Sequence, residues 1–300
     1  MMRSLYSGVT GLKAHQTKMD VIGNNISNVN TAGYKSSRVV FQDIYSQTVA
    51  PASASTPTTG GTNPQQIGLG VQLATIDVLD TESSSQYTGN TLDLAIDGDG
   101  YFIINARGVV SYTRSGNFYT DEENYLVDSN GNYVQGCELD VNGAPVYRRP
   151  VADPVTGVVT ETICAATDAG AHLTLQKVLI DPDYYDVSIS SNGQVVGLDE
   201  ATSQSHVLGQ LVLATFANPN GLEKTGNNAY RPTVNSGDPV LDTPGEGGTG
   251  KLNPGSLEMS NVDLTAEFAD MIVTQRGFQA NARIITTTDS MLEELVNMVR

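Results

Sequence analysis

Residues 245–252 have the types and spacing closest to a catalytic or cofactor-binding motif. They nearly match the phosphate-binding pattern GxxxxGK[ST], in which backbone amides hold phosphates and the last hydroxyl binds Mg²⁺. Leu252 stands at that last position and has no hydroxyl, and residues 242–244 before the loop do not resemble a buried strand. We therefore interpret this stretch as a flexible loop.

Two further stretches, residues 97–100 and 128–132, are rich in Asp, Asn and Gly, as calcium-binding loops are. Neither continues to the bidentate Glu that completes such a loop, so both are interpreted as turns. His15, His172 and His206 have no partners at metal-ligand spacing, and no serine-hydrolase or zinc-protease motif is present. The sequence therefore predicts no catalytic residue, no metal site, no cofactor and no enzyme activity.

The charge of the chain is concentrated in its middle. The 300 residues carry 16 Lys and Arg against 33 Asp and Glu, a net charge of −17. Residues 1–30 hold three basic and one acidic residue and residues 261–300 hold three and six, which leaves 10 basic and 26 acidic residues for 31–260. An acidic surface of this kind argues against nucleic acid and anionic membranes as partners.

Neither a membrane span nor a cleaved secretory signal is expected. No stretch approaches the roughly 20 apolar residues of a transmembrane helix, and residues 1–9 lack the apolar run of a signal peptide. Cys137 and Cys164 fit no metal spacing, and the sequence leaves open whether they are free thiols or a disulfide.

The strongest structural pattern is an apolar row in residues 261–300, which predicts a long helix. The spacing of steps of four and three averages 3.5 residues, as in a coiled-coil seam, with Gln275 and Asp289 as interruptions. The row consists of Leu264, Phe268, Met271, Phe278, Ala282, Ile285, Leu292, Val296 and Val299.

A second helix is predicted over residues 4–29, with the same spacing at Leu5, Val9, Leu12, Met19 and Ile26. Gly8, Gly11 and Gly23 lower its helix propensity, so alone it should be marginal. Gln16 and Gln275 are each the polar residue of their seam, and we consider them either as tolerated polar positions or as a pair that sets register between the helices.

Between the helices, residues 36–49 are expected to be extended, and residues 50–66 read as a low-complexity arm with no apolar residue larger than Ala. Short alternating segments from 67 to 240 predict strands, and the turn at 97–100 predicts a hairpin between 92–96 and 101–104. We expect a less ordered excursion at 138–172.

The predicted fold class is α+β, with N- and C-terminal helices that form a coiled-coil-like pair and enclose a mainly β central domain. Its divisions are a helix at 1–30, an extended arm and linker at 31–66, an all-β outer domain at 67–240, a return linker at 241–260 and a helix at 261–300.

Residues 24–35 resemble the N-terminal signature of the bacterial flagellar rod and hook proteins. Residues 92–102 and 112–118 resemble the start of the β domain of this family, and residues 257–264 and 275–281 its C-terminal signature. The resemblance covers both ends and most of the middle. The signature residues are Asn24, Asn25, Asn28, Thr31, Gly33, Tyr34 and Lys35.

Within the family, residues 273–278 and 284–292 look most like the hook members of Gram-positive bacteria, while the arm and the length are shared with distal rod members. The resemblance therefore implies a subunit of the hook, the flexible tubular coupling that transmits motor torque to the filament, with the distal rod as the alternative. The resemblance implies export through the flagellar type III apparatus without a cleaved signal, and a place in the extracellular hook or basal body. It also implies a helical polymer of the chain with itself, next to distal rod, hook cap and hook–filament junction proteins. A β-domain binding or adhesin module is the alternative from another class, weakened by the absence of Trp and an aromatic share of 6%.

The residues predicted to mediate this subunit assembly are those of the two seams. They are Leu5, Val9, Leu12, Gln16, Met19, Ile26, Leu264, Phe268, Met271, Gln275, Phe278, Ala282, Ile285, Leu292 and Val296.

Overall fold

A computed structural model of the chain describes residues 2–55, 57, 60–137, 139, 145–152, 159–164, 172–182, 184–199 and 204–298. The chain divides into two compact units, which we call the helical unit and the β unit. The helical unit comprises Met1–Val29, Ser36–Leu79 and Val262–Arg300, and the β unit comprises Asn30–Lys35 and Asp80–Asn261. The chain therefore has a helix near each end and a mainly β central domain, as the sequence predicts.

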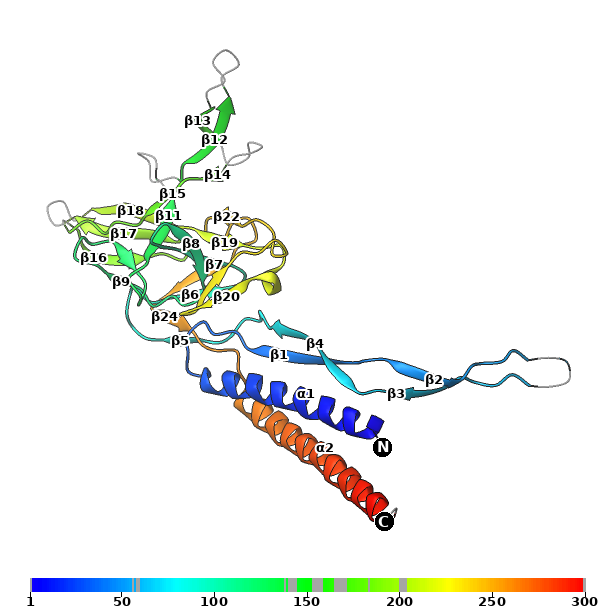
Figure 1. The fold of residues 1–300 in the computed structure, drawn as a ribbon. Helices are drawn as coiled ribbons and strands as arrows, with labels where there is room; N and C mark the ends of the chain where they lie inside the picture. The colour runs from blue at the N-terminus through cyan, green and yellow to red at the C-terminus, as the bar shows by residue number, and fades with distance from the viewer. Residues whose placement is uncertain are drawn as a thin grey trace. The chain divides into compact units, whose positions relative to one another are not determined.

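The helical unit contains both long helices, α1 (Met2–Ser27) and α2 (Leu264–Met298). They lie side by side in antiparallel orientation (Figure 1). Asp263 caps α2, because its Oδ1 accepts a hydrogen bond of 2.8 Å from the backbone N–H of Thr265. The predicted helices are therefore present, and α1 ends within the Asn-rich signature.

A long antiparallel ribbon completes the helical unit (Figure 1). Strand β1 (Ser37–Asp43) pairs with β4 (Val71–Val78), and β2 (Ser46–Ala50) pairs with β3 (Gln65–Gly68). Both β1 and β4 contact α1. A two-stranded ribbon is only marginally stable in water unless it packs against another surface. Many large apolar side chains of this ribbon are nevertheless exposed in the single chain. These side chains are Val40, Ile44, Tyr45, Val49, Ile67, Leu73 and Ile76.

The β unit is built on an antiparallel sheet whose main path runs β16-β17-β18-β11-β7-β8-β21-β20. Its central strand β7 is buried on both faces: Phe102 and Ile104 belong to one cluster of buried side chains, and Tyr101 and Ile103 to another. This follows from the alternation of side chains along a strand. The strands of this unit are β5 (Ser85–Tyr87), β6 (Leu94–Asp97), β7 (Tyr101–Ala106), β8 (Val109–Thr113), β9 (Tyr119–Thr120), β10 (Leu126–Val127), β11 (Tyr133–Cys137), β12 (Tyr147–Ala152), β13 (Val159–Cys164), β14 (His172–Leu173), β15 (Leu175–Lys177), β16 (Tyr184–Ile189), β17 (Gln194–Asp199), β18 (Ser205–Leu211), β19 (Leu213–Thr215), β20 (Glu223–Gly226), β21 (Ala229–Arg231), β22 (Val240–Asp242), β23 (Lys251–Pro254) and β24 (Ser256–Glu258), with a 3-10 turn at Pro219–Gly221.

The predicted hairpin across residues 97–100 is wrong. Both strands exist, but β6 pairs with β23 and β7 pairs with β8. The returning chain takes the edge of β6 that a hairpin partner would need. Gly250 lies so close to Gly98 that a Cβ on Gly98 would be 2.8 Å from the Gly250 Cα.

The domain limits also differ from the prediction. The predicted outer domain begins at residue 67, whereas β4 pairs with β1 and belongs to the helical unit. Alternation identifies a strand but not the strand with which it pairs. The predicted low-complexity arm at 50–66 begins in β2, ends in β3 and has a β-bridge between Ser53 and Thr62. Much of the predicted excursion at 138–172 lies outside the described residues.

Candidate assembly site

The face that α1 turns toward α2 is made of small residues. A Cβ on Gly11 would lie 2.6 Å from Nδ2 of Asn281, and a Cβ on Gly277 would lie 2.6 Å from Cε1 of His15. The helix backbones therefore approach more closely than any larger residue permits. Gly8 and Gly11, which lower the helix propensity of α1, thus permit its packing against α2. The buried residues of α1 are Gly8, Gly11, Ala14, Ile22 and Asn25.

We predict that Gly11→Val will separate the helices and destabilise their packing by about 1–3 kcal/mol, because overpacking forces backbone shifts. The matched control is Gly23→Ala, since a Cβ on Gly23 meets nothing within 4 Å. That control should stabilise α1 by about 0.5–1 kcal/mol through helix propensity. Thermal melting followed by far-ultraviolet circular dichroism should show shifts of opposite sign. Equal shifts in one direction would contradict the close approach.

The face of α2 that is buried differs from the predicted seam at two positions, each shifted by one residue. Met271, Phe278, Ile285 and Leu292 are half-buried, as members of the predicted row, but the other buried positions are Thr274 and Thr288. Those two replace Gln275 and Asp289 of the predicted row, both of which are exposed. Hydrophobic periodicity could not identify a column of Thr residues.

The predicted assembly residues thus fall into two groups. The half-buried ones are Leu5, Leu12, Met19, Ile26, Met271, Phe278, Ala282, Ile285 and Leu292. The exposed ones are Val9, Gln16, Leu264, Phe268, Gln275 and Val296. Since Gln16 and Gln275 are both exposed, they do not form a buried register pair within one chain.

Several large apolar side chains of α2 remain uncovered in the single chain. Phe268 is 49% exposed, Ile272 58%, Met291 49% and Val296 64%. Phe268 and Val296 belong to the column of the predicted seam that α1 does not cover. Uncovered apolar rows on a long helix are typical of surfaces that pack against another protein.

Asn25 joins the three parts of the helical unit. It is 1% exposed. Its Nδ2 donates to the Ser37 carbonyl at 2.9 Å and to Glu267 Oε1 at 2.8 Å, while its Oδ1 accepts from the Ser37 N–H at 3.0 Å. One side chain therefore fixes the end of α1, the start of β1 and the first turn of α2. This gives a structural reason for an Asn at this signature position.

His15 lies where α1, α2 and β1 meet. Its ring packs edge-on against Phe41 with centroids 6.2 Å apart, and its Nδ1 is buried with no hydrogen-bond partner in the described part of the chain. Burial and, to a lesser extent, the nearby Lys18 ammonium lower the pKa of His15 below its ordinary value of 6.5. The imidazole is therefore neutral in the packed state.

We predict that the helical unit loses stability as the pH falls from about 7 to about 5. The pKa of His15 is lower in the folded state than in the unfolded state, so the unfolded state binds a proton more readily over this range and is favoured. The His15→Gln variant should show a shallower dependence of melting temperature on pH. His206→Gln, which alters an exposed histidine of β18, should keep the dependence of the unmodified chain. Parallel curves for the unmodified chain and His15→Gln would contradict the assignment.

The remaining signature residues occupy the connection after α1. Asn28 Nδ2 donates to the carbonyl of Asn24 at 2.9 Å, and the Tyr34 N–H donates to the Thr31 carbonyl at 3.3 Å. Gly33 has a φ of +68°, and a Cβ there would lie 2.7 Å from the Arg114 backbone. Only glycine combines this conformation with such a close approach.

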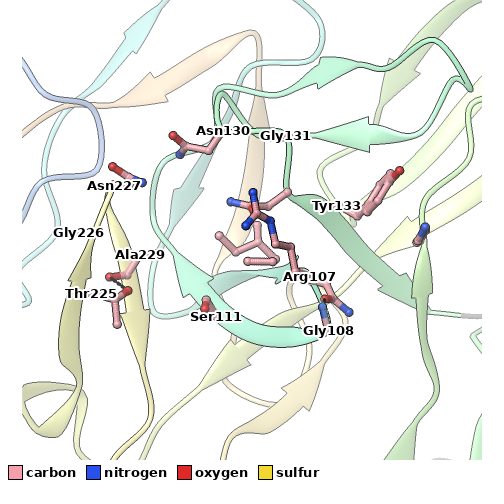
Figure 2. A pocket seen from close by; sticks show the side chains of 15 residues that line it. Arg107, Gly108, Ser111, Asn130, Gly131, Tyr133, Thr225, Gly226, Asn227 and Ala229 are labelled. Atoms are coloured by element: carbon pink, nitrogen blue, oxygen red, sulfur yellow. Dashed lines mark hydrogen bonds between the residues drawn. The ribbon is translucent and has the colours of Figure 1, made fainter.

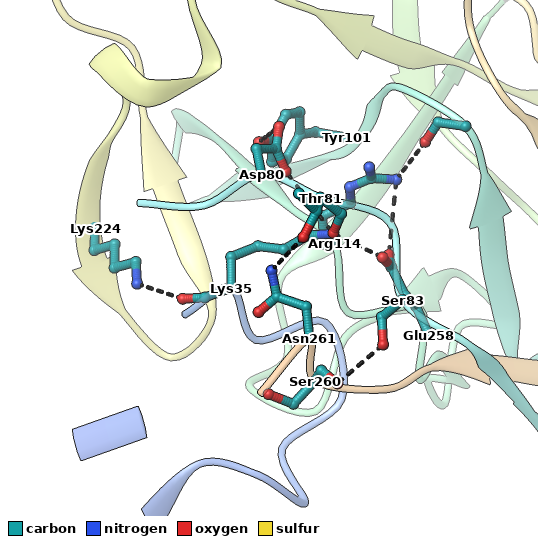
Figure 3. Close-up of polar contacts among 11 residues, drawn as sticks. Lys35, Asp80, Thr81, Ser83, Tyr101, Arg114, Lys224, Glu258, Ser260 and Asn261 are labelled. Carbon is teal, nitrogen blue, oxygen red and sulfur yellow. Dashed lines mark hydrogen bonds and ion pairs between the residues drawn. The ribbon is translucent and has the colours of Figure 1, made fainter. Parts of the chain in front are cut away.

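Lys35 enters a buried cluster of charges in the β unit, which we call the junction cluster: Lys35, Asp80, Arg114 and Glu258 (Figure 3). Lys35 Nζ lies 2.7 Å from Glu258 Oε1 and 3.8 Å from Asp80 Oδ1. Arg114 Nη1 lies 3.7 Å from Glu258 Oε2. Two cations and two carboxylates balance, which is the condition under which buried charges are tolerated.

Hydrogen bonds to neutral groups hold the junction cluster in place. Lys35 Nζ donates to the Thr81 carbonyl at 2.7 Å, and Arg114 donates to the Gly98 carbonyl at 2.9 Å. Tyr101 O–H donates to Asp80 Oδ2 at 2.7 Å, and burial, with the Asp80 charge, raises the pKa of this phenol. The cluster therefore joins residues 35, 80, 114 and 258, which are far apart in the sequence.

The cluster brings together residues from all three regions of the resemblance. Lys35 comes from the N-terminal signature, Arg114 from the start of the β domain and Glu258 from the C-terminal signature. Asp80, Arg114 and Glu258 were not identified as site residues from the sequence, since acidic residues are too common in this chain to be informative singly. The signal that could have found Arg114 and Glu258 is their presence within the resembling motifs.

Comparison with known proteins gives matches over the same regions. Sequence profiles described as flagella basal body rod protein, flagellar hook protein FlgE/F/G D1 domain, and flagellar basal body rod FlgEFG protein C-terminal match residues 5–35, 95–197 and 253–298. The chain belongs to the flagellar basal-body rod and hook protein family.

Three relatives illustrate the similarity. Flagellar basal-body rod protein FlgG of Bacillus subtilis (strain 168) is 49% identical over 301 residues, covering 100% of both chains. Flagellar hook protein FlgE of Borreliella burgdorferi is 32% identical over 441 aligned residues, covering 99% of this chain and 100% of the relative. FlgG of the same organism is 33% identical over 306 residues, again covering 100% of both chains. The chain is thus similar to structural components of the flagellum.

Within the described residues, neither helix is long and apolar enough to cross a membrane. In the same part of the chain, no group of three or more His, Cys, Asp or Glu side chains is placed to hold a metal ion.

Proposed function

We propose that this chain is a self-assembling axial subunit of the bacterial flagellum, and that its place is the distal rod. The observation that supports the rod most directly is the full-length, 49% identical relative named FlgG, a basal-body rod protein. The relatives named as hook proteins align over 441 and 464 residues, so they carry segments that this chain of 300 residues lacks.

The uncovered apolar side chains support assembly. Phe268, Ile272 and Val296 on α2, and Tyr45 and Val49 on the ribbon, need a partner surface that the single chain does not offer. Further copies of the chain can supply it. A contact between different faces of identical subunits does not close on itself and generates a helical polymer.

The second candidate is the hook subunit, which the residues at 273–278 and 284–292 favour by their resemblance to hook members. In either role, we propose that the chain reaches its site through the flagellar export apparatus and contacts neighbouring axial proteins as well as itself. The helices of neighbouring copies would pack together along the polymer.

Electron microscopy of polymers grown from the purified chain tests both candidates. Straight, stiff tubes are expected for a rod subunit, and curved tubes for a hook subunit. Removing residues 286–300 should abolish polymerisation and leave the β unit folded, because the C-terminal half of α2 is lost. A chain that forms no polymer at any concentration, or a truncated chain that still polymerises, would overturn the assembly role of α2.

Helix content gives an independent measurement. Because much of the apolar surface of the helices is covered only in a polymer, circular dichroism of the dilute monomer should show less helix than that of the polymer. Equal helix content would mean that the helices need no partner.

A further inference from the structure

The β unit contains an open cavity of about 770 Å³ (Figure 2). Its lining includes three turns, namely the β7–β8 turn with Arg107 and Gly108, the turn at 130–132 and the β20–β21 turn with Asn227, together with residues of the neighbouring strands and Lys177 of β15. The residues at its rim are exposed, so the cavity is open to a partner.

The walls of the cavity have a defined backbone. Arg107 and Gly108 have φ values of +55° and +89°, and Asn227 and Asn228 have +53° and +57°. Positive φ at both central residues is the conformation of tight two-residue hairpin turns. Asn105 Oδ1 also accepts from the Gly108 N–H at 2.8 Å. A cavity with such walls needs little ordering when it binds a partner.

The third turn, at residues 130–132, is held by hydrogen bonds to the side chain of Asp128. Asp128 Oδ1 accepts from the N–H groups of Asn130 and Asn132 at 2.7 and 2.9 Å, and its Oδ2 accepts from Asn132 Nδ2 at 2.9 Å. The carboxylate of Asp128 is therefore occupied by its own turn and is not one of the lining residues.

The charge of the cavity is opposite to that of the chain. Among the described residues, Arg107 and Lys177 are the charged side chains that line it, and no carboxylate does. Lys177 Nζ lies 3.7 Å from the ring centroid of Tyr133 and 5.2 Å from that of Tyr125, which positions the ammonium by cation–π attraction. Arg107 is exposed and forms no ion pair within the described residues. Two such cations, with Asn amides around them, suit carboxylates.

We propose that this cavity binds an acidic segment of a second copy of the chain, the turn between β9 and β10. Asp121, Glu122 and Glu123 follow one another in that turn and are all exposed. Subunits with a net charge of −17 repel one another, so a contact that sets cations against acidic surface reduces this repulsion. The cavity and the turn are different patches, as an open-ended polymer requires. This inference rests on the proposed self-assembly.

The test measures the critical concentration for polymerisation of the full chain by sedimentation. The Arg107→Glu/Lys177→Glu variant should raise it at least tenfold, and Glu122→Lys/Glu123→Lys should do the same. The combination of all four changes should return it to within about threefold of the unmodified chain, because the ion pairs re-form with reversed sign. Arg231→Glu, at an exposed cation of β21 that does not line the cavity, is the matched control.

Urea unfolding of each variant confirms that the β unit remains folded. If the cavity variant polymerises as the Arg231→Glu control does, the cavity is not a contact. If it is defective and the four-fold variant shows no recovery, the turn is not its occupant. Failure of the unmodified chain to polymerise would instead refute the proposed function itself.

Discussion

Glu258→Leu should lower the free energy of unfolding of the β unit by about 3–5 kcal/mol, because it leaves Lys35 and Arg114 buried with only Asp80 to balance them. Lys35 and Arg114 are each 1% exposed, so water cannot take the place of the lost carboxylate. Urea titration followed by circular dichroism of the strands measures the loss. Glu223→Gln, at an exposed position of β20, is the control and should change stability by less than about 0.5 kcal/mol.

A double variant separates charge imbalance from lost packing. Lys35→Met/Glu258→Leu removes one charge of each sign and leaves Arg114 with Asp80. Since apolar replacement of a whole buried pair is often close to neutral, this variant should be more stable than Glu258→Leu alone. Two results would show that the junction cluster does not act as a balanced network. The first is a loss for Glu258→Leu as small as that for Glu223→Gln. The second is a loss for the double variant equal to the sum of the losses for Lys35→Met and Glu258→Leu measured separately.

Asn25→Asp should disrupt the helical unit as strongly, by about 3 kcal/mol or more at neutral pH. The change removes the donor that binds the Ser37 carbonyl and Glu267, and it places a second carboxylate where an amide now lies 2.8 Å from Glu267 Oε1. Helix content by circular dichroism and the critical concentration for polymerisation both report the effect. Lowering the pH to about 4 should narrow the difference in helix content between this variant and the unmodified chain at the same pH, because a protonated carboxyl can again donate.

Asn24→Asp is the matched control, since Asn24 is the exposed neighbour and its Oδ1 acts as an acceptor for Asn28 Nδ2 at 3.1 Å, a role that a carboxylate keeps. It should leave helix content nearly unchanged. Equal losses in the two variants would mean that position 25 acts through general helix propensity rather than through its three hydrogen bonds.

The sequence predicted the two helices because each has a long apolar repeat without Pro. It predicted part of the strands of the β unit, because those alternate between turns, but it did not identify others, such as β11 on the main path of the sheet. In α2 it placed the exposed Gln275 and Asp289 in the seam and did not identify the buried Thr274 and Thr288. The contact column contains Thr274 and Thr288, and threonines carry no periodic apolar signal. The predicted placement of β4 and the predicted pairing of β6 were wrong for another reason: an alternating pattern identifies a strand but does not specify which strand lies beside it.

The junction cluster lay beyond sequence reasoning for a different reason. In a chain with 33 acidic residues, nothing distinguishes Glu258 or Asp80 until the fold buries them beside Lys35 and Arg114. The signature residues were recognised by resemblance, and the structure adds the physical roles of Asn25, Gly33 and Lys35.

The helical unit is interrupted twice in the sequence, and this determines when it can form. Asn25 and Glu267, which bond to one another, are 242 positions apart. A chain delivered with its N-terminus first would present α1 and the ribbon long before α2 arrives, and closing so large a loop is slow unless the β unit has already folded between them. Completion of the helical unit therefore reports that the whole chain has arrived. If the chain assembles as proposed, a copy whose α2 has not yet joined α1 and β1 would lack part of the surface of the helical unit, and its association with other copies would be delayed until α2 is in place.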